Sequence, residues 1–307
     1  MTNMTEFQFL SSDGHTQLHG MLWEPTDTPV RAVLQVCHGV AEHIARYDAF
    51  ARALNEQGIA VAGHDHLGHG KSLPQGGTPV YFGQGNTWNT VVDDIYVLHQ
   101  RLLQKYPDTP LCIMGHSMGS FLARSYAARH GDDIDAFVFC GTAGHNPVMP
   151  IAKLIANAEI KRTGGDVPSK KLDLLAFGAY NKPFEQRTAF DWLSANQANV
   201  DRYIADPLCG FTFTAAAFRD LFTGLSEVSR KDWAAKVPNR PILVIAGDKD
   251  PVGSMGKGPT EVAGRLLNSG HDVILKLYPG MRHEILNETG KKKVWQDVLD
   301  FLNAQIG

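Results

Sequence analysis

The stretch 111–119, Leu-Cys-Ile-Met-Gly-His-Ser-Met-Gly, decides the fold of this chain. It opens with a short apolar run typical of a buried strand, and helical periodicity follows it over residues 121–129. Gly115 and Gly119 flank Ser117 where a tight strand-to-helix turn would bring a Cβ into neighbouring backbone. Because a strand precedes the motif and a helix follows it, a chance G-x-S-x-G is the weaker interpretation. The stretch therefore predicts a nucleophilic serine at a helix N-terminus.

Outward from this stretch, short apolar runs alternate with longer helical patterns. This alternation is typical of a mostly parallel sheet with crossover helices, so the expected fold class is α/β, a mostly parallel central sheet flanked by helices. The expected strands are 18–23, 32–37, 59–62, 111–114, 136–140, 242–246 and 273–278, and the expected helices are 47–57, 91–105, 121–129, 260–267 and 294–305.

The alternation stops near Asn146, and only helical periodicity follows until about residue 237. We therefore expect a helical cap at 146–237, inserted into a core formed by 1–145 and 238–307, with Pro147 and Pro238 at the two edges. Apolar residues at helical spacing in the cap would either line a substrate-binding site or pack the cap onto the core. They are Ile151, Leu154 and Ile155.

A serine hydroxyl is a weak nucleophile, so Ser117 needs a histidine base and an acid that orients it. The expected strands 242–246 and 273–278 are followed by Gly-Asp-Lys-Asp-Pro at 247–251 and by Pro-Gly-Met-Arg-His-Glu at 279–284. Both segments lie at the carboxyl edge of the sheet, where open α/β sheets build their sites, and they supply His283 as the base. Asp248 and Asp250 compete as the acid: Pro251 holds Asp250 extended, Asp248 could cap the turn, and spacing does not separate them.

An oxyanion hole needs backbone N–H groups aimed at the developing charge. One is expected from Met118, directly after the serine, and the other from the loop after strand 32–37. That loop reads His-Gly-Val-Ala-Glu-His at 38–43, which makes Val40 the expected second donor. His38 and His43 are expected to hold the loop by hydrogen bonds.

The segment 64–72 resembles two other kinds of site. His64, His66 and His69 resemble the H-x-H-x-D-H pattern of binuclear zinc hydrolases, but Gly68 stands where that pattern needs aspartate. The run 70–72, Gly-Lys-Ser, resembles the end of a phosphate-binding loop, but Asp65 stands where that loop needs glycine. We therefore expect no catalytic metal and no cofactor.

Charge and composition exclude other classes of protein. The formal charge is −3, from 29 basic and 32 acidic residues without a run of like charge, which argues against a nucleic-acid partner. The first ten residues lack the pattern of a signal peptide, and no stretch reaches the ~20 apolar residues that span a bilayer. The cysteines are expected to be buried free thiols in a reducing cytoplasm; they are Cys37, Cys112, Cys140 and Cys209.

Five segments together resemble one family. They are 38–43 with Arg46 and Tyr47, 65–72, 115–119, 247–250 and 278–284, and they resemble the monoacylglycerol lipase and lysophospholipase branch of the α/β-hydrolase fold, the serine aminopeptidase S33-like hydrolases. The resemblance runs from about residue 10 to 305. In that family the acid is the aspartate of G-x-x-D, which implies Asp250 rather than Asp248, and the oxyanion donors carry over to Val40 and Met118.

The resemblance implies a cofactor-independent serine hydrolase that cleaves carboxylic esters, such as monoacylglycerols, lysophospholipids or related medium-chain acyl esters, through an acyl-enzyme. It implies that the cap covers the site, and transient contact of the cap with a membrane surface is compatible with that role. Two alternatives stay open: an amidase or aminopeptidase-like hydrolase, and a non-catalytic ligand-binding homologue on the same fold. The cap matches no substrate motif, so acyl length, head group and oligomeric state are not specified.

Overall fold

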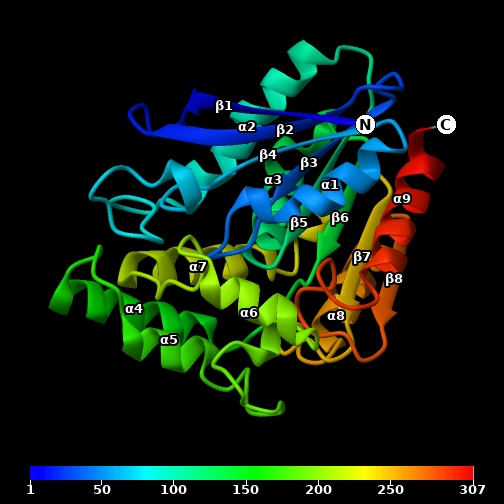
Figure 1. Cartoon of the computed structure of the whole chain (residues 1–307). Helices are drawn as coiled ribbons and strands as arrows, with labels where there is room; N and C mark the ends of the chain where they lie inside the picture. The colour runs from blue at the N-terminus through cyan, green and yellow to red at the C-terminus, as the bar shows by residue number, and fades with distance from the viewer. Residues whose placement is uncertain (307) are drawn as a thin grey trace.

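An eight-stranded sheet runs through the computed structural model, which describes residues 1–306 (Figure 1). The strand order is β1-β2-β4-β3-β5-β6-β7-β8. β1 pairs antiparallel with β2 and β2 with β4, while the other neighbours are parallel, which confirms the mostly parallel α/β fold. The strands are β1 Thr2–Leu10, β2 Gln17–Pro25, β3 Ala32–Cys37, β4 Ile59–His64, β5 Leu111–His116, β6 Ala136–Cys140, β7 Ile242–Gly247 and β8 Val273–Tyr278.

Helices cover both faces of the sheet. α1 (Asp48–Asn55) and α9 (Lys291–Ile306) pack on one face, and α2 (Trp88–Lys105), α3 (Met118–His130) and α8 (Lys257–Asn268) pack on the other. Successive strand residues alternate between the two cores: Val33 belongs to the α2/α3 side, and Leu34 belongs to the α1/α9 side. A strand buried on both faces has no polar side, which explains the unbroken apolar runs seen in the sequence.

β1 is absent from the sequence-based expectation. Its residues alternate, and only Phe9 among them is buried, with Phe7 half-buried. The strand pairs along its whole length with β2, so that Phe9 lies opposite Leu18. An edge strand with one exposed face has polar residues between its apolar ones. β1 therefore lacks the continuous apolar run that predicts the other strands.

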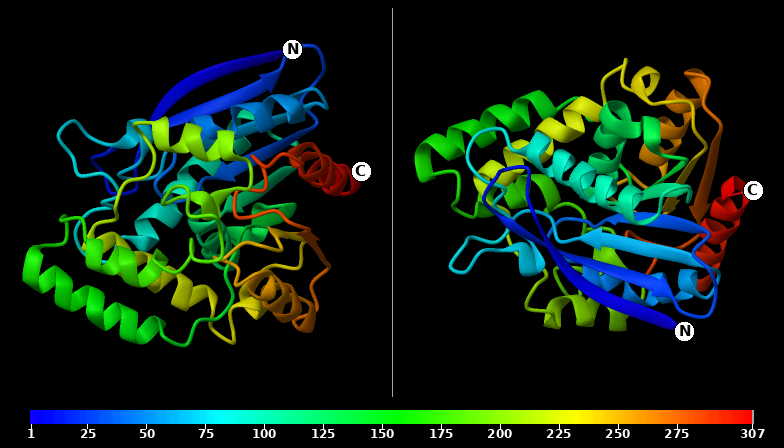
Figure 2. Two further views of the ribbon diagram at one scale, coloured as in Figure 1. Left: turned by 60° about the horizontal axis from the view of Figure 1, so that its bottom comes forward. Right: turned by 90° about the horizontal axis from the view of Figure 1, so that it is seen from above.

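The segment between β6 and β7 is helical, as the sequence predicts. It contains α4 (Met149–Thr163), α5 (Lys170–Phe177), α6 (Gln197–Ala205) and α7 (Ala215–Val228). The buried face of α7, with Phe218 and Phe222, belongs to the same hydrophobic core as Leu122 of α3. α4 and α5 instead lie away from the β1–β2 hairpin and from α9 (Figure 1, Figure 2).

The cysteines are free, and three of them are buried in the sheet: Cys37 in β3, Cys112 in β5 and Cys140 in β6. Cys209 differs from the expectation of four buried thiols, because it lies in an irregular segment after α6 and is only partly buried. Among residues 1–306, no helix has both the length and the apolar character needed to cross a bilayer.

Candidate active site

Ser117 occupies a strained turn between β5 and α3. Its backbone has φ 54° and ψ −123°, a conformation that costs an L-residue on the order of 1–3 kcal/mol and survives only where the surroundings enforce it. A Cβ on Gly119 would lie 2.0 Å from the carbonyl oxygen of Cys37, and a Cβ on Gly115 would lie 2.1 Å from that of Gly119. The two glycines are therefore required by close backbone approach, as the motif predicts.

Asp250 and His283 form a buried pair. The Asp250 Oδ2 lies 2.9 Å from Nδ1 of His283, and its Oδ1 accepts a 2.9 Å hydrogen bond from the N–H of Val252. Asp248 does not reach the histidine; its Oδ1 accepts a 2.8 Å hydrogen bond from the N–H of Gly280. The structure thus brings Asp250 to His283 and leaves Asp248 capping the neighbouring turn.

The loop that carries His283 lies directly against the end of β7. A Cβ on Gly247 would be 2.1 Å from the carbonyl oxygen of Met281, so only glycine allows this approach. The indole of Trp192 packs on the other side of the imidazole, with ring centroids 5.2 Å apart. Burial lowers the pKa of His283, but the carboxylates of Asp250, Glu284 and Glu42 together outweigh burial, and the net pKa is raised above the ordinary value of about 6.5.

In the loop after β3, the residues on both sides of Val40 use their backbone N–H groups in hydrogen bonds. The N–H of Gly39 donates to Oε1 of Glu42 at 2.5 Å, and the N–H of Ala41 donates to Nε2 of His69 at 3.1 Å. Met118 is the first residue of α3, so its N–H has no acceptor inside the helix. Val40, Met118 and Ser117 line the same cavity.

Two of the three histidines that resemble a zinc motif, His66 and His69, hold this loop in place by hydrogen bonds. His66 donates from its backbone N–H to Nε2 of His38 at 3.0 Å, and the Nδ1 of His38 lies 2.6 Å from the carbonyl oxygen of Gly39. His69 uses both ring nitrogens, one on Ala41 and one 2.9 Å from the carbonyl oxygen of Leu67. Burial lowers the pKa of His38 and His66 well below the ordinary range, which keeps these rings neutral.

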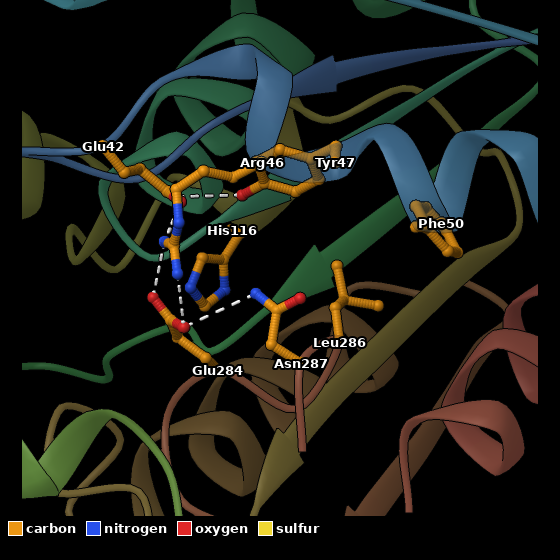
Figure 3. Close-up of a pocket in the computed structure, with 8 residues that line it drawn as sticks. All are labelled: Glu42, Arg46, Tyr47, Phe50, His116, Glu284, Leu286 and Asn287. Atoms are coloured by element: carbon orange, nitrogen blue, oxygen red, sulfur yellow. Dashed lines mark hydrogen bonds and ion pairs between the residues drawn. The ribbon is translucent and has the colours of Figure 1, made fainter. Parts of the chain in front are cut away.

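A buried ion network joins the Val40 loop to the His283 loop (Figure 3). The Arg46 guanidinium donates to Oε2 of Glu42 at 2.6 Å and to both oxygens of Glu284 at 2.7 and 2.8 Å. Asn199 of α6 adds a 2.6 Å hydrogen bond to Glu284. Burial opposes ionisation of Glu284, but Arg46 outweighs it and lowers the pKa of Glu284 to about 2. The Val40 loop and the His283 loop are therefore fixed relative to each other by one cation.

Ser117 and His283 open into a cavity of about 1260 Å³. Residues of α4, α5 and α7 form much of its wall, and aliphatic and aromatic side chains dominate the lining. Ile151 and Ile155 are part of the lining. Leu154, expected from the same helical spacing, is not part of it and is 69% exposed.

Sequence reasoning did not assign roles to Arg46, Glu284 or Trp192. Arg46 and Glu284 are charged residues within the segments that resemble the family. Nothing in the spacing of these segments predicts that Arg46 contacts Glu284. Trp192 lies in a short 3-10 helix, Asp191–Leu193, within the cap segment, where the sequence offers no motif. A charged residue next to a motif that is expected to be buried needs a partner of opposite charge. This is the one signal in the sequence that could have identified Arg46 and Glu284.

Comparison with known proteins gives matches over most of the chain. The family model described as serine aminopeptidase, S33 matches residues 28–290. The chain is 31% identical to a monoacylglycerol lipase of Mycolicibacterium smegmatis over 93% of this chain and 92% of that protein. It is 30% identical to the human monoglyceride lipase over 87% of this chain and 79% of that protein.

The solved structures include a carboxyl esterase from Bacillus coagulans in complex with glycerol. It superposes with a TM-score of 0.93 at 33% identity and covers 99% of both chains. With the family model covering most of the sequence, the chain belongs to the serine aminopeptidase S33 family of α/β-hydrolases.

Proposed function

We propose that the protein is a serine esterase that cleaves monoacylglycerols, lysophospholipids or related medium-chain acyl esters. The observation that carries the proposal is the Asp250–His283 pair at 2.9 Å, whose histidine lines one largely apolar cavity together with Ser117 in its strained turn. The relatives named monoacylglycerol lipase and carboxyl esterase support ester hydrolysis as the reaction class.

The proposed chemistry uses only groups of this chain. Ser117 Oγ attacks the ester carbonyl while His283 accepts its proton, and the Val40 and Met118 N–H groups stabilise the oxyanion. His283 then returns the proton to the leaving alcohol, and an acyl-enzyme on Ser117 remains. Water, deprotonated by the same imidazole, attacks the acyl carbonyl, and the imidazolium then returns the proton to Ser117 Oγ as the bond to the serine breaks and the fatty acid leaves. Asp250 fixes the tautomer of His283 and stabilises its protonated form.

The raised pKa of His283 predicts the pH profile. Only the neutral imidazole accepts the serine proton, so kcat/KM for p-nitrophenyl acetate should rise with pH through one ionisation. Because Asp250 raises that pKa, the midpoint should lie above about 6.5. A midpoint at or below this value, measured where activity recovers fully on return to neutral pH, would contradict the proposed base.

We propose that residues 146–237 act as a cap over a core formed by 1–145 and 238–307. Support comes from the cavity, whose wall combines Ser117 and His283 with residues of α4 and α5. The proposed acyl site uses Ile151 and Ile155, because both line this cavity. Leu154 is assigned to the outer surface of the cap instead, because it is exposed and does not line this cavity.

Ile155→Ala should change acyl-length preference. Each buried methylene contributes about 0.8 kcal/mol, so loss of the Ile155 contacts should lower kcat/KM for a long-chain ester on the order of tenfold, with acetate nearly unchanged. Leu154→Ala, one residue earlier on α4, is the matched control and should leave both rates unchanged. Equal losses for both esters with Ile155→Ala, or only a lower melting temperature, would make Ile155 a packing residue.

A substrate panel tests the proposed function itself. It should contain p-nitrophenyl esters from acetate to palmitate, monoacylglycerols and lysophospholipids, together with aminoacyl p-nitroanilides for the aminopeptidase alternative. We expect turnover of the esters and at least 100-fold lower kcat/KM for the anilides. Preference for the anilides would establish the aminopeptidase alternative in place of the proposed function.

We also propose that the cap contacts lipid surfaces transiently. Large apolar side chains are exposed on and around α4 and α5, and exposed lysines accompany them, a combination that suits an anionic interface. The apolar residues are Val148, Ile151, Leu154, Leu174 and Leu175, and the lysines are Lys161, Lys170 and Lys171.

Leu154→Glu should weaken co-sedimentation with anionic phospholipid vesicles at least threefold and leave hydrolysis of dissolved p-nitrophenyl acetate unchanged. The matched control is Leu267→Glu, because Leu267 is similarly exposed on α8 of the core. Equal weakening by both substitutions would attribute binding to overall charge and not to the cap.

The four free cysteines support a cytoplasmic location, since a reducing compartment keeps thiols unpaired.

A further inference from the structure

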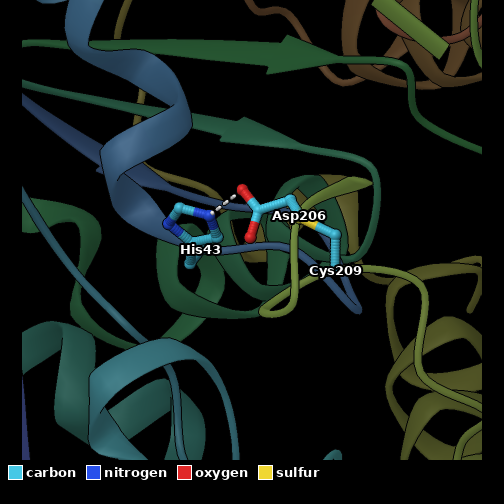
Figure 4. A group of neighbouring side chains, drawn as sticks. All are labelled: His43, Asp206 and Cys209. Atoms are coloured by element: carbon cyan, nitrogen blue, oxygen red, sulfur yellow. Dashed lines mark hydrogen bonds and ion pairs between the residues drawn. The ribbon is translucent and has the colours of Figure 1, made fainter. Parts of the chain in front are cut away.

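Three metal-ligating side chains meet outside the proposed catalytic groups (Figure 4). One donor atom each of His43, Asp206 and Cys209 lies within 4.8 Å of the others. His43 follows the Val40 loop, and Asp206 and Cys209 follow α6 in the cap segment. The cluster therefore connects two parts of the chain that are far apart in sequence.

The spacing suits a tetrahedral cation. Imidazole, carboxylate and thiolate are the ligands of zinc sites, and at ordinary bond lengths their donor atoms are about 3.4–3.6 Å apart. In the structure the Nε2 of His43 lies 2.9 Å from Oδ2 of Asp206, and all three donors fit within 4.8 Å. If the donor atoms of His43 and Asp206 moved slightly apart and that of Cys209 moved slightly closer to them, the three atoms would occupy three of the four ligand positions around a tetrahedral cation.

We propose that His43, Asp206 and Cys209 form a site for a divalent cation of the zinc class, and that the bound cation inhibits hydrolysis reversibly. The inhibitory half rests on the proposed ester hydrolysis. The binding half does not, because it is measured without substrate.

The protonation states fit this site. Although burial opposes ionisation of Asp206, its hydrogen bond to His43 lowers the net pKa, so the carboxylate is ready to ligate. Burial raises the pKa of the Cys209 thiol, so the cation must displace its proton, which passes to solvent. His43 ligates through Nε2 as a neutral imidazole, with its one ring proton on Nδ1. Cys209 is partly exposed and therefore accessible. Nearby charges are Glu42 and Glu284, which favour a cation, and Arg46, which opposes one.

The same cap segment already holds the Val40 loop. The hydroxyl of Tyr203 donates to the carbonyl oxygen of Ala41 at 2.9 Å, and the N–H of Gly210 donates to the same oxygen at 3.0 Å. Ala41 directly follows Val40 and has a strained φ of 52°. A cation that separates His43 from Asp206 must move one of these segments, and displacement of an oxyanion donor by a fraction of an ångström lowers turnover.

Cobalt(II) is the direct probe, because a thiolate ligand gives a sulfur-to-cobalt charge-transfer band in the near ultraviolet. Titration of the full-length protein should give this band with one equivalent bound. Cys209→Ser and Asp206→Asn are conservative changes that test the ligands. His15→Ala is the matched control, since His15 is an exposed histidine 3.5 Å from the carboxylate of Asp13.

We expect the band in the parent and in His15→Ala, its loss in Cys209→Ser, and at least tenfold weaker cobalt binding in Asp206→Asn. Saturating zinc should inhibit p-nitrophenyl acetate hydrolysis at least tenfold in the parent and less than twofold in Cys209→Ser, and chelator should restore the parent rate. Absence of the band overturns the site. Inhibition that persists in Cys209→Ser overturns the regulatory role, because the cation would then act elsewhere, for example on His283.

Discussion

Ser117→Ala should abolish ester hydrolysis and leave the fold intact. Alanine is no larger than serine, so the turn between β5 and α3 accommodates it, while the attacking oxygen is lost. We expect kcat to fall on the order of 10³-fold or more, with the residual rate coming from the oxyanion donors and substrate binding. The measurement is p-nitrophenyl ester hydrolysis by purified protein, with circular dichroism and the melting temperature as evidence of folding.

Ser226→Ala is the matched control, because the Ser226 hydroxyl only bonds to the carbonyl oxygen of Phe222 within its own helix. This variant should keep nearly the whole parent activity. A Ser117→Ala variant that retained more than a tenth of the parent activity would contradict Ser117 as the nucleophile.

Asp250→Asn should lose on the order of 10³- to 10⁴-fold in kcat, because an amide cannot hold His283 in the tautomer that accepts the serine proton. The change is nearly isosteric, and the oxygen of the substituted amide would still accept the hydrogen bond from the N–H of Val252. Thermal unfolding measured beside the kinetics separates this chemical loss from a loss of fold.

Asp248→Asn is the natural comparison. Asp248 bonds to the N–H of Gly280 and not to His283, so we expect less than a threefold loss of activity and a loss of about 1 kcal/mol or less in stability. Equal losses for the two variants, or the reverse order, would assign the orienting role to Asp248.

The strands of the sheet could be predicted because most of them are buried on both faces, which gives each a continuous apolar run such as 136–140. β1 could not, since its outward face is polar and only Phe9 is buried. Helix starts also differ: α3 begins at Met118, three residues before its periodicity becomes clear, because the nucleophile turn and not an apolar pattern starts it.

The candidate site also combines residues that the sequence predicts with residues that it does not. Ser117 directly follows β5 and His283 lies in the loop after β8, and parallel strands bring their carboxyl ends together without further information. Spacing did not separate Asp250 from Asp248, because both follow the same strand. The family resemblance implied Asp250, and Asp250 is the aspartate that lies 2.9 Å from His283. Arg46 joins Glu42 to Glu284 across 238 residues of sequence, a distance that no local pattern encodes.

Covalent labelling with a fluorophosphonate probe shows directly whether Ser117 is a nucleophile activated by His283. Peptide mass spectrometry should place one equivalent of probe on Ser117 in the parent protein. Labelling should be absent in Ser117→Ala and at least 100-fold slower in Asp250→Asn. An unlabelled parent protein, or a probe attached to any other residue, would contradict the account and favour the non-catalytic ligand-binding alternative.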